Sequence, residues 1–116
     1  MSYPLVHISN STAYAASGKV YYASAFCSDD DYSVAANGGT WTANSRGVCL
    51  VTEVSATVYV NGQPVGASPY TSSGTSYSQF AIIQTSPGSF AVTRVTTEVE
   101  KVDVGELQPE PVEMQK

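Results

Sequence analysis

The stretch Val48-Cys-Leu-Val-Thr-Glu-Val-Ser-Ala-Thr-Val-Tyr-Val60 predicts the fold of this chain. Apart from Thr52, every second residue in it is apolar, and the opposite parity is mostly polar or amphipathic. The apolar series is Val48, Leu50, Val54, Ala56, Val58 and Val60. A period of two puts alternate side chains on opposite faces, so we expect a β-strand with one buried face. A strand of this length would span roughly 43 Å at about 3.3 Å per residue, so a bend or bulge is expected.

The next two residues, Asn61-Gly62, predict how this strand ends. Both residues tolerate the positive φ that a type I′ hairpin turn requires. Pairing of Val60 with Gln63 would place Val58 opposite Val65, which keeps the apolar residues of both strands on one face. The sequence therefore predicts a rigid β-hairpin here, not a ligand site.

The rest of the first 97 residues is a series of short strand patterns separated by turns. Pro64 cannot donate a ladder hydrogen bond, so strand 63–67 is expected at a sheet edge. The other expected strands are residues 5–10, 19–27, 32–35, 80–84 and 90–95. Turn signals every eight to twelve residues predict an all-β fold, an antiparallel β-sandwich of seven or eight strands. We assign residues 1–97 to this domain and residues 98–116 to an acidic C-terminal tail.

Charge is unevenly distributed along the chain and excludes several partners. The net charge is −5, of which residues 98–116 contribute −4 through six carboxylates and two lysines. No basic patch exists, so neither a nucleic-acid partner nor a polybasic membrane anchor is expected. No apolar run reaches 18 residues, so no transmembrane segment is expected. The start of the chain lacks a signal-peptide pattern. Charged residues are 13% of the chain, and the Ser, Thr, Gly and Tyr in their place favour an extracellular or cell-surface β protein.

The sequence offers little material for catalysis, cofactors or metals. His7 is the one histidine, and no nucleophile, phosphate-loop or zinc pattern occurs, so we expect no enzyme and no cofactor. Asp29, Asp30 and Asp31 are weak candidates for a Ca²⁺ site, but adjacent carboxylates without alternating ligands are more typical of a solvated turn.

Cys27 and Cys49 are predicted to form a disulfide if the protein meets an oxidising compartment. The sequence places Cys27 at the end of one strand and Cys49 at the start of another, with a polar, glycine-rich loop between them. Closing this loop would add about 3 kcal/mol in the chain-entropy model. The alternative is two small buried side chains without a bond.

Two segments are candidate ligand-binding loops. In the Gly-rich loop 37–46, Trp41 and Arg46 are the candidate contact residues, although Trp41 could instead plug one end of the fold. Residues 69–78 lack apolar periodicity and combine tyrosines with hydroxyls, as adaptable binding loops do. The candidates in this segment are Tyr70, Ser72, Ser73, Thr75 and Tyr77. A plain polar connection is the alternative reading.

The C-terminal tail is a candidate assembly segment. Val99, Val102 and Val104 alternate with charges in a way that fits neither a helix nor a strand alone. A segment of this kind can add a strand to an open sheet edge of a neighbouring copy, with Pro109 and Pro111 ending the contact. The alternative is a solubilising appendage.

Short motifs support a second class of function. Val6, Ile8, Asn10 and Thr12, with the Gly-Gly-Thr-Trp segment at 38–41, resemble small leaderless β-sandwich proteins of the aegerolysin kind. That resemblance implies recognition of membrane lipid by aromatic loops. The sequence alone favours a non-enzymatic binding or self-assembly module, a structural subunit or adhesive protein, with a homo-oligomer or another protein as partner. The alternative is a lipid- or glycan-binding protein, toxin-like in its membrane recognition.

Overall fold

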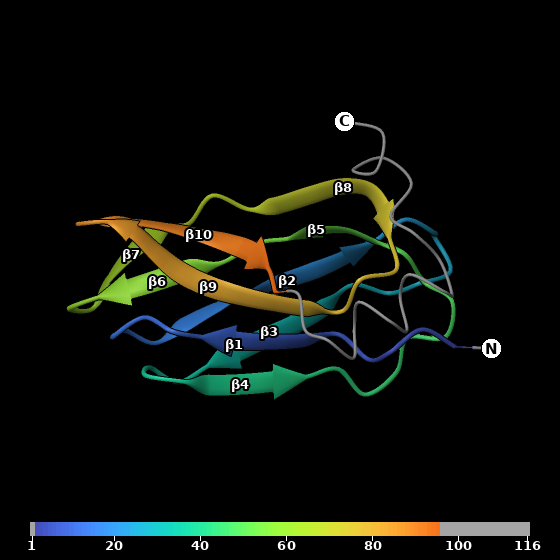
Figure 1. Ribbon diagram of the computed structural model, residues 1–116, viewed down its shortest axis with the longest axis horizontal. Helices are drawn as coiled ribbons and strands as arrows, with labels where there is room; N and C mark the ends of the chain where they lie inside the picture. The colour runs from blue at the N-terminus through green and yellow to red at the C-terminus, as the bar shows by residue number, and fades with distance from the viewer. Residues whose placement is uncertain (1, 96–116) are drawn as a thin grey trace.

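The computed structural model describes residues 2–95 of the 116-residue chain. These residues form ten β-strands and contain no helix, so none long and apolar enough to cross a membrane occurs among them. The strands in Figure 1 are β1 (His7–Asn10), β2 (Ala16–Tyr22), β3 (Asp30–Val34), β4 (Gly39–Thr42), β5 (Val51–Val54), β6 (Thr57–Val60), β7 (Gln63–Gly66), β8 (Tyr70–Thr75), β9 (Gln79–Ser86) and β10 (Ser89–Arg94). The tail with Val99, Val102 and Val104 lies outside the described residues.

The ten strands form two sheets. One has the order β10-β9-β1-β4, and the other has the order β7-β6-β2-β5-β8, with β3 also paired to β2. All strands run roughly along the long axis of the molecule, so their connections gather at two ends (Figure 1). The β6–β7 and β9–β10 turns lie at one end, and the N-terminus lies at the other with the loops that follow β2 and β4.

The predicted all-β class is confirmed, but two details of the prediction are wrong. The structure has ten strands because the central stretch is divided in two, and because residues 39–42 of the predicted Gly-rich loop and residues 70–75 each form a strand of their own. The sheets are not purely antiparallel, because β1 pairs with β9 in parallel, with Ile8 opposite Phe80. The first strand thus lies between β9 and β4 in the four-stranded sheet.

Side chains from both sheets pack into one apolar core. Burying a Val, Ile or Phe side chain stabilises the fold by about 1.5–3 kcal/mol, so a core of this size can hold two sheets together without a covering helix. Its buried members are Val6, Ile8, Ala16, Val20, Tyr32, Val34, Ala43, Val51, Val54, Ala56, Val58, Phe80, Ile82, Phe90 and Val92.

The central stretch contains the expected irregularity. Both β5 and β6 pair with β2, and the ladder is interrupted between them at Ser55 and Ala56. The ladder with β2 also shifts register at Thr52, because Glu53 pairs with Tyr21 and Val51 with Tyr22, and an extra residue of this kind exchanges the two faces of a strand. Consequently Val51 is fully buried. The prediction that Val48 points inward is wrong, because Val48 lies in the turn before β5 and is 66% exposed.

The hairpin after β6 forms as predicted. Asn61 and Gly62 have φ values of 51° and 83°, which are the positive angles of a type I′ turn. Val60 pairs with Gln63 and Val58 with Val65. Strand β7 pairs with β6 alone, so the predicted edge position of the proline-containing strand is confirmed.

The motif Asn10-Ser-Thr12 has a structural role at the end of β1. The side-chain amide of Asn10 is fully buried and donates to the carbonyls of Tyr14 (2.7 Å) and Ala35 (3.1 Å). Its oxygen accepts from the backbone N–H and the hydroxyl of Thr12, at 3.0 and 2.8 Å. Asn10 and Thr12 therefore satisfy each other's buried hydrogen-bonding groups and those of the neighbouring backbone. They fix the turn at the end of the molecule opposite the N-terminus.

Gly18 allows a hydrogen bond to cross the six-stranded sheet. The Tyr32 hydroxyl donates to the Ser55 carbonyl at 2.6 Å, at the interruption between β5 and β6. A Cβ on Gly18 would lie 2.0 Å from that carbonyl oxygen and 2.8 Å from the Tyr32 hydroxyl. A side chain at position 18 therefore cannot coexist with this bond.

We expect Gly18→Ala to lower the free energy of unfolding by about 2 kcal/mol or more, through overpacking and loss of the Tyr32 hydrogen bond. Gly66→Ala is the matched control, because a Cβ there meets no atom within 4 Å, and its effect should stay within about 0.5 kcal/mol. Denaturant unfolding followed by Trp41 fluorescence measures both. Equal effects of the two substitutions would show that the crossing at Gly18 is not a constraint.

Candidate functional site

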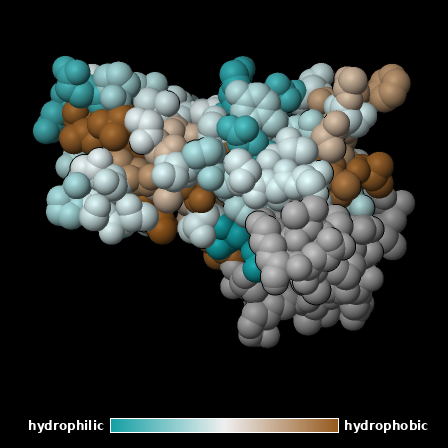
Figure 2. Space-filling view, turned by 90° about the horizontal axis from the view of Figure 1, so that it is seen from above, coloured by the Kyte–Doolittle hydropathy of each residue, from teal (hydrophilic) through white to brown (hydrophobic). Residues whose placement is uncertain are grey.

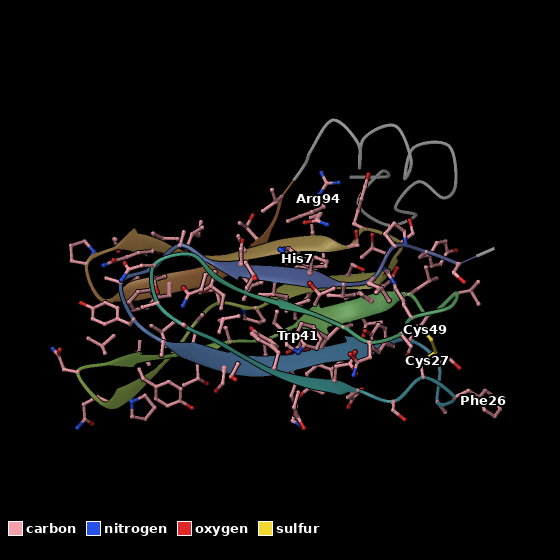
Figure 3. All side chains as sticks on the ribbon, turned by 90° about the horizontal axis from the view of Figure 1, so that it is seen from below. His7, Phe26, Cys27, Trp41, Cys49 and Arg94 are labelled. Atoms are coloured by element: carbon pink, nitrogen blue, oxygen red, sulfur yellow. A yellow bond between two sulfur atoms is a disulfide. The ribbon has the colours of Figure 1, made fainter. Side chains whose placement is uncertain are left out.

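Three segments meet at the end of the molecule that holds the N-terminus: residues 3–5, residues 23–29 after β2, and residues 44–50 between β4 and β5. The Tyr3 N–H donates to the Gly47 carbonyl and the Ala23 N–H to the Leu50 carbonyl, both at 2.8 Å. A disulfide joins the second and third segments, as Figure 3 shows. We call this region the disulfide end.

The predicted bond between Cys27 and Cys49 is confirmed, with 6.1 Å between their Cα atoms. The prediction that both cysteines flank strands is wrong, because β2 already ends at Tyr22 and β5 begins at Val51. Each cysteine instead closes a turn of its own, with the Cys27 N–H donating to the Ser24 carbonyl (3.0 Å) and the Cys49 N–H to the Arg46 carbonyl (3.1 Å). The bond therefore fixes two loops against each other.

Arg46, predicted as a ligand contact, is a structural residue of this end. Its side chain is 5% exposed, and its guanidinium donates to three backbone carbonyls. The bonds run from Nε to Cys49 (2.9 Å), from Nη1 to Pro4 (3.0 Å) and from Nη2 to Thr75 (2.8 Å). The guanidinium also lies over the Tyr3 ring, 5.3 Å from its centre. These contacts join residues 3–5 and 44–50 to Thr75, the last residue of β8.

An exposed apolar surface covers the same end. Among the described residues, four large apolar side chains are exposed, and Phe26, Val48 and Leu5 belong to the segments of the disulfide end. Phe26 is 100% exposed, although it falls within the predicted strand 19–27. That prediction fails because β2 ends before Phe26. Figure 3 shows Phe26 projecting from the end, and Figure 2 shows apolar side chains at the same right-hand end.

The sequence carried a weak signal for this surface. Ala23 and Ala25 favour a strand only weakly, so strand alternation need not continue through Phe26. The structure forms the predicted disulfide but ends the strand at Tyr22.

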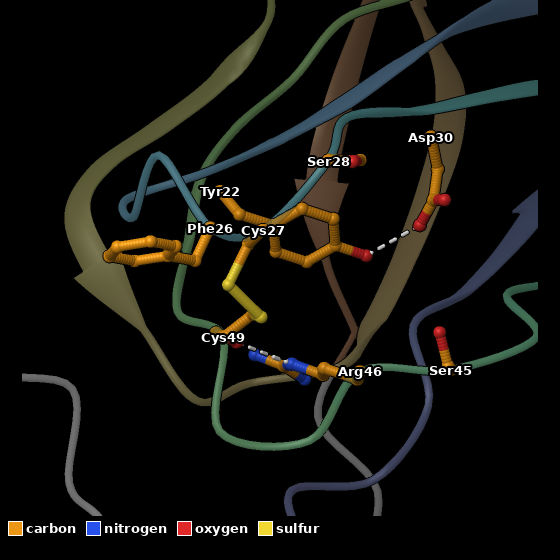
Figure 4. A pocket seen from close by; sticks show the side chains of 8 residues that line it. All are labelled: Tyr22, Phe26, Cys27, Ser28, Asp30, Ser45, Arg46 and Cys49. Atoms are coloured by element: carbon orange, nitrogen blue, oxygen red, sulfur yellow. Dashed lines mark hydrogen bonds between the residues drawn. A yellow bond between two sulfur atoms is a disulfide. The ribbon is translucent and has the colours of Figure 1, made fainter.

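A pocket of about 270 Å³ lies beside the disulfide (Figure 4). Tyr22 forms one side, and its hydroxyl donates to Oδ2 of Asp30 at 2.7 Å. Ser28 and Ser45 contribute exposed hydroxyls. Burial, with the hydrogen bond to Asp30 as the next cause, raises the pKa of Tyr22 above its ordinary value of 10.0. The Tyr22 proton is therefore held on the phenol, which donates it to the hydrogen bond with Asp30.

The aspartate run does not form one cluster. Asp30 and Asp31 belong to β3, which corrects the predicted solvated turn, and successive strand residues face opposite sides. Asp30 meets Tyr22, while Asp31 pairs with Lys19 at 2.5 Å on the outer face. Among the described residues, no three His, Cys, Asp or Glu side chains are grouped as a metal site would require.

Trp41 is placed against the core. It lies on β4, half-buried, with its ring 5.6 Å from that of Tyr32. The sequence left two roles open for Trp41, a ligand contact or a packing residue, and this geometry favours packing.

The predicted binding loop at 69–78 is a strand over most of its length, because β8 spans Tyr70–Thr75. Tyr70 stacks near Phe80 with 4.9 Å between ring centres, and the Ser72 hydroxyl donates to the Val51 carbonyl at 3.1 Å. Thr75 is fully buried, and Tyr77 lies under Arg94. Ser73 is an exposed residue of the same strand. The candidates of this segment are therefore spread along a strand, and Thr75 alone is brought to Arg46, through its carbonyl.

We expect Arg46→Met to lower the free energy of unfolding by about 2–4 kcal/mol, because three carbonyls lose their charged donor while chain length is kept. Arg94→Met is the control, since Arg94 lies 3.9 Å from the Tyr77 ring centre and such a contact is worth about 1 kcal/mol or less at a surface. Thermal and denaturant unfolding measure the difference. If Arg46→Met lowers the free energy of unfolding no more than Arg94→Met does, Arg46 is not a structural residue and is again a candidate ligand contact.

The raised pKa of Tyr22 predicts a pH dependence of stability. The folded state holds this proton more tightly than the unfolded chain does, so the contribution is complete below pH 10 and falls as pH rises above that value. Tyr22→Phe should make the fall in stability at alkaline pH shallower, as measured by denaturant unfolding at a series of pH values. Identical curves for the two proteins would contradict the assignment.

Comparisons with known proteins find no relative of this chain. No family model matches it, and no curated protein and no solved structure does so either. The motifs that resemble aegerolysins lie at core and turn positions, such as the buried Val6, Ile8 and Asn10, which an all-β fold requires for its own packing. Function must therefore be argued from the geometry of the disulfide end.

Proposed function

We propose that this chain is a non-enzymatic β-sandwich binding module, an adhesive protein or structural subunit, that contacts another protein through the disulfide end. A second copy of the chain is the simplest such partner. One observation carries the proposal: Phe26 is 100% exposed in a loop that a disulfide and backbone hydrogen bonds hold in place. Val48 and Leu5 extend the apolar surface around it.

The energetics favour this surface as a contact. Burying the Phe26 ring on a partner would contribute about 1.5–3 kcal/mol. Aromatic side chains at the centre of an interface often carry much of its binding energy. Since the loops are already fixed by Cys27–Cys49 and Arg46, little further conformational entropy is lost on binding.

The edges at β7, β3 and β10 are less suited to contact than this end. β7 contains Pro64, and β3 carries Asp30 and Asp31, which are features that oppose edge-to-edge pairing. The edge at β10 is bridged by Ser68, whose N–H donates to the Phe90 carbonyl (2.9 Å) and whose carbonyl accepts from Val92 (2.8 Å). These features support an end-on contact.

The described residues give little support to an enzyme. His7 Nδ1 lies 2.8 Å from the Thr42 hydroxyl, but the two residues are directly opposed on β1 and β4, as any cross-strand pair is. A nucleophile and base would also need a third group that orients the imidazole. No carboxylate among the described residues hydrogen-bonds to His7, so cross-strand pairing explains the contact.

A lipid interface is the second candidate, because a fully exposed phenylalanine beside Val48 is suited to insertion between headgroups. The neighbouring Asp29, Asp30 and Asp31 would repel an anionic bilayer. This candidate is therefore restricted to zwitterionic membranes.

We expect the double substitution Phe26→Ser with Val48→Ser to weaken self-association by about ten-fold or more, because it removes the centre of the apolar surface. Sedimentation velocity over a concentration series measures this. Tyr59→Ser is the control, since Tyr59 is 41% exposed but lies on β6, away from the disulfide end.

Flotation with phosphatidylcholine vesicles, run on the same proteins, tests the second candidate. Vesicle binding lost in the double variant would assign the surface to lipid. If the double variant and Tyr59→Ser associate equally, the disulfide end is not the contact surface.

A further inference from the structure

The pocket at the disulfide end has polar groups that the fold does not use. Asp30 accepts one hydrogen bond, from Tyr22 to Oδ2, and its Oδ1 has no hydrogen-bond partner among the described residues. The hydroxyls of Ser28 and Ser45 face the same pocket and bond to no described side chain or backbone group. A carboxylate oxygen and two hydroxyls are therefore directed at a space of about 270 Å³.

Two aromatic rings complement these polar groups. The Tyr22 ring is half-buried beside the disulfide, and the exposed Phe26 ring lies across the disulfide from it (Figure 4). A ligand that covers the disulfide would meet polar acceptors on the Asp30 side and an apolar ring on the Phe26 side. Sites with a few convergent polar groups and aromatic walls bind small molecules in this way.

Charge narrows the class of ligand. The guanidinium of Arg46 borders the pocket but donates to three backbone carbonyls, so a phosphate or sulfate would have to displace those bonds. Asp30 would repel an anion directly. The arrangement suits a neutral ligand with several hydroxyl donors and one apolar face.

Resting on the proposed role of the disulfide end as a contact surface, we infer that this pocket binds a neutral carbohydrate. Asp30 Oδ1 accepts hydrogen bonds from the sugar hydroxyls, Ser28 and Ser45 bond to its ring substituents, and the Phe26 ring packs on the apolar C–H face. The Tyr22 hydroxyl, by donating to Oδ2, holds the carboxylate in orientation. Tyr22 is therefore a positioning residue for Asp30.

The test uses the oxidised full-length chain on a printed array of neutral, sialylated and sulfated glycans. We expect binding to neutral glycans and none to the anionic ones. Asp30→Asn keeps the shape and an acceptor for Tyr22, yet should weaken binding by about ten-fold, since a charge-assisted hydrogen bond is lost. Asp31→Asn makes the same change of charge one residue away, on the outer face beside Lys19, and should stay within about two-fold.

Tyr22→Phe is the second variant and should weaken binding less than Asp30→Asn, with a melting temperature that shows it folded. An array without neutral glycans bound, or equal losses for Asp30→Asn and Asp31→Asn, would overturn the carbohydrate assignment. This experiment separates the carbohydrate hypothesis from the contact-surface hypothesis, because Asp30→Asn leaves the apolar side chains of Phe26 and Val48 in place. An empty array, with self-association still lost in the Phe26→Ser, Val48→Ser protein, would leave the contact surface standing and remove the carbohydrate.

Discussion

The buried guanidinium of Arg46 is the constraint on which the disulfide end depends. Its three hydrogen bonds reach Pro4 ahead of the four-stranded sheet, Cys49 ahead of β5, and Thr75 at the end of β8 in the six-stranded sheet. The planar guanidinium directs its five N–H donors outward from three nitrogens and can therefore reach three separated carbonyls, whereas the three donors of a lysine all leave a single nitrogen. Without it those carbonyls would lose their donor, and each unsatisfied group costs about 1–3 kcal/mol when buried. The bond between Cys27 and Cys49 then closes a framework that Arg46 has already aligned.

This framework explains how an exposed aromatic ring can be held in a defined position. The Phe26 side chain is fully exposed and makes no contribution to the core. Its loop is fixed by the disulfide of the neighbouring Cys27 and by backbone N–H groups that donate to the Ser24 carbonyl and hydroxyl. Fold stability therefore gives no reason for a large apolar side chain there. A contact that buries it would recover the hydrophobic free energy without ordering the loop anew. The same reasoning covers Val48 on the other side of the disulfide.

Those parts of the fold that rest on local rules could be predicted from the sequence. Asn61-Gly62 predicts its own turn because few other residues accept two positive φ angles, and alternation over 54–58 predicts which residues are buried. Prediction failed where a tertiary contact overrides the pattern. The register shift at Thr52 exchanges the faces of the strand, and the hydroxyl-rich residues 70–75 form a strand because β5 offers a partner edge. Arg46 was predicted as a ligand contact because the carbonyls that accept its hydrogen bonds lie up to 42 residues away in the sequence.

The pocket shows how one local rule can serve both the fold and the site. Strand alternation sends Asp31 outward to Lys19, directly across from it in the β2–β3 ladder, and turns Asp30 toward Tyr22 at the end of the inward-facing row. Tyr32 and Val34 continue that row into the core, so β3 is apolar inside the fold and carries a carboxylate at the position where the core ends. A hydrophobic residue at position 30 would extend the core toward the disulfide end, whereas an aspartate leaves a polar opening there. The run of aspartates is thus a single strand pattern in which one residue stabilises the surface of the sheet and the next supplies the pocket with its charge.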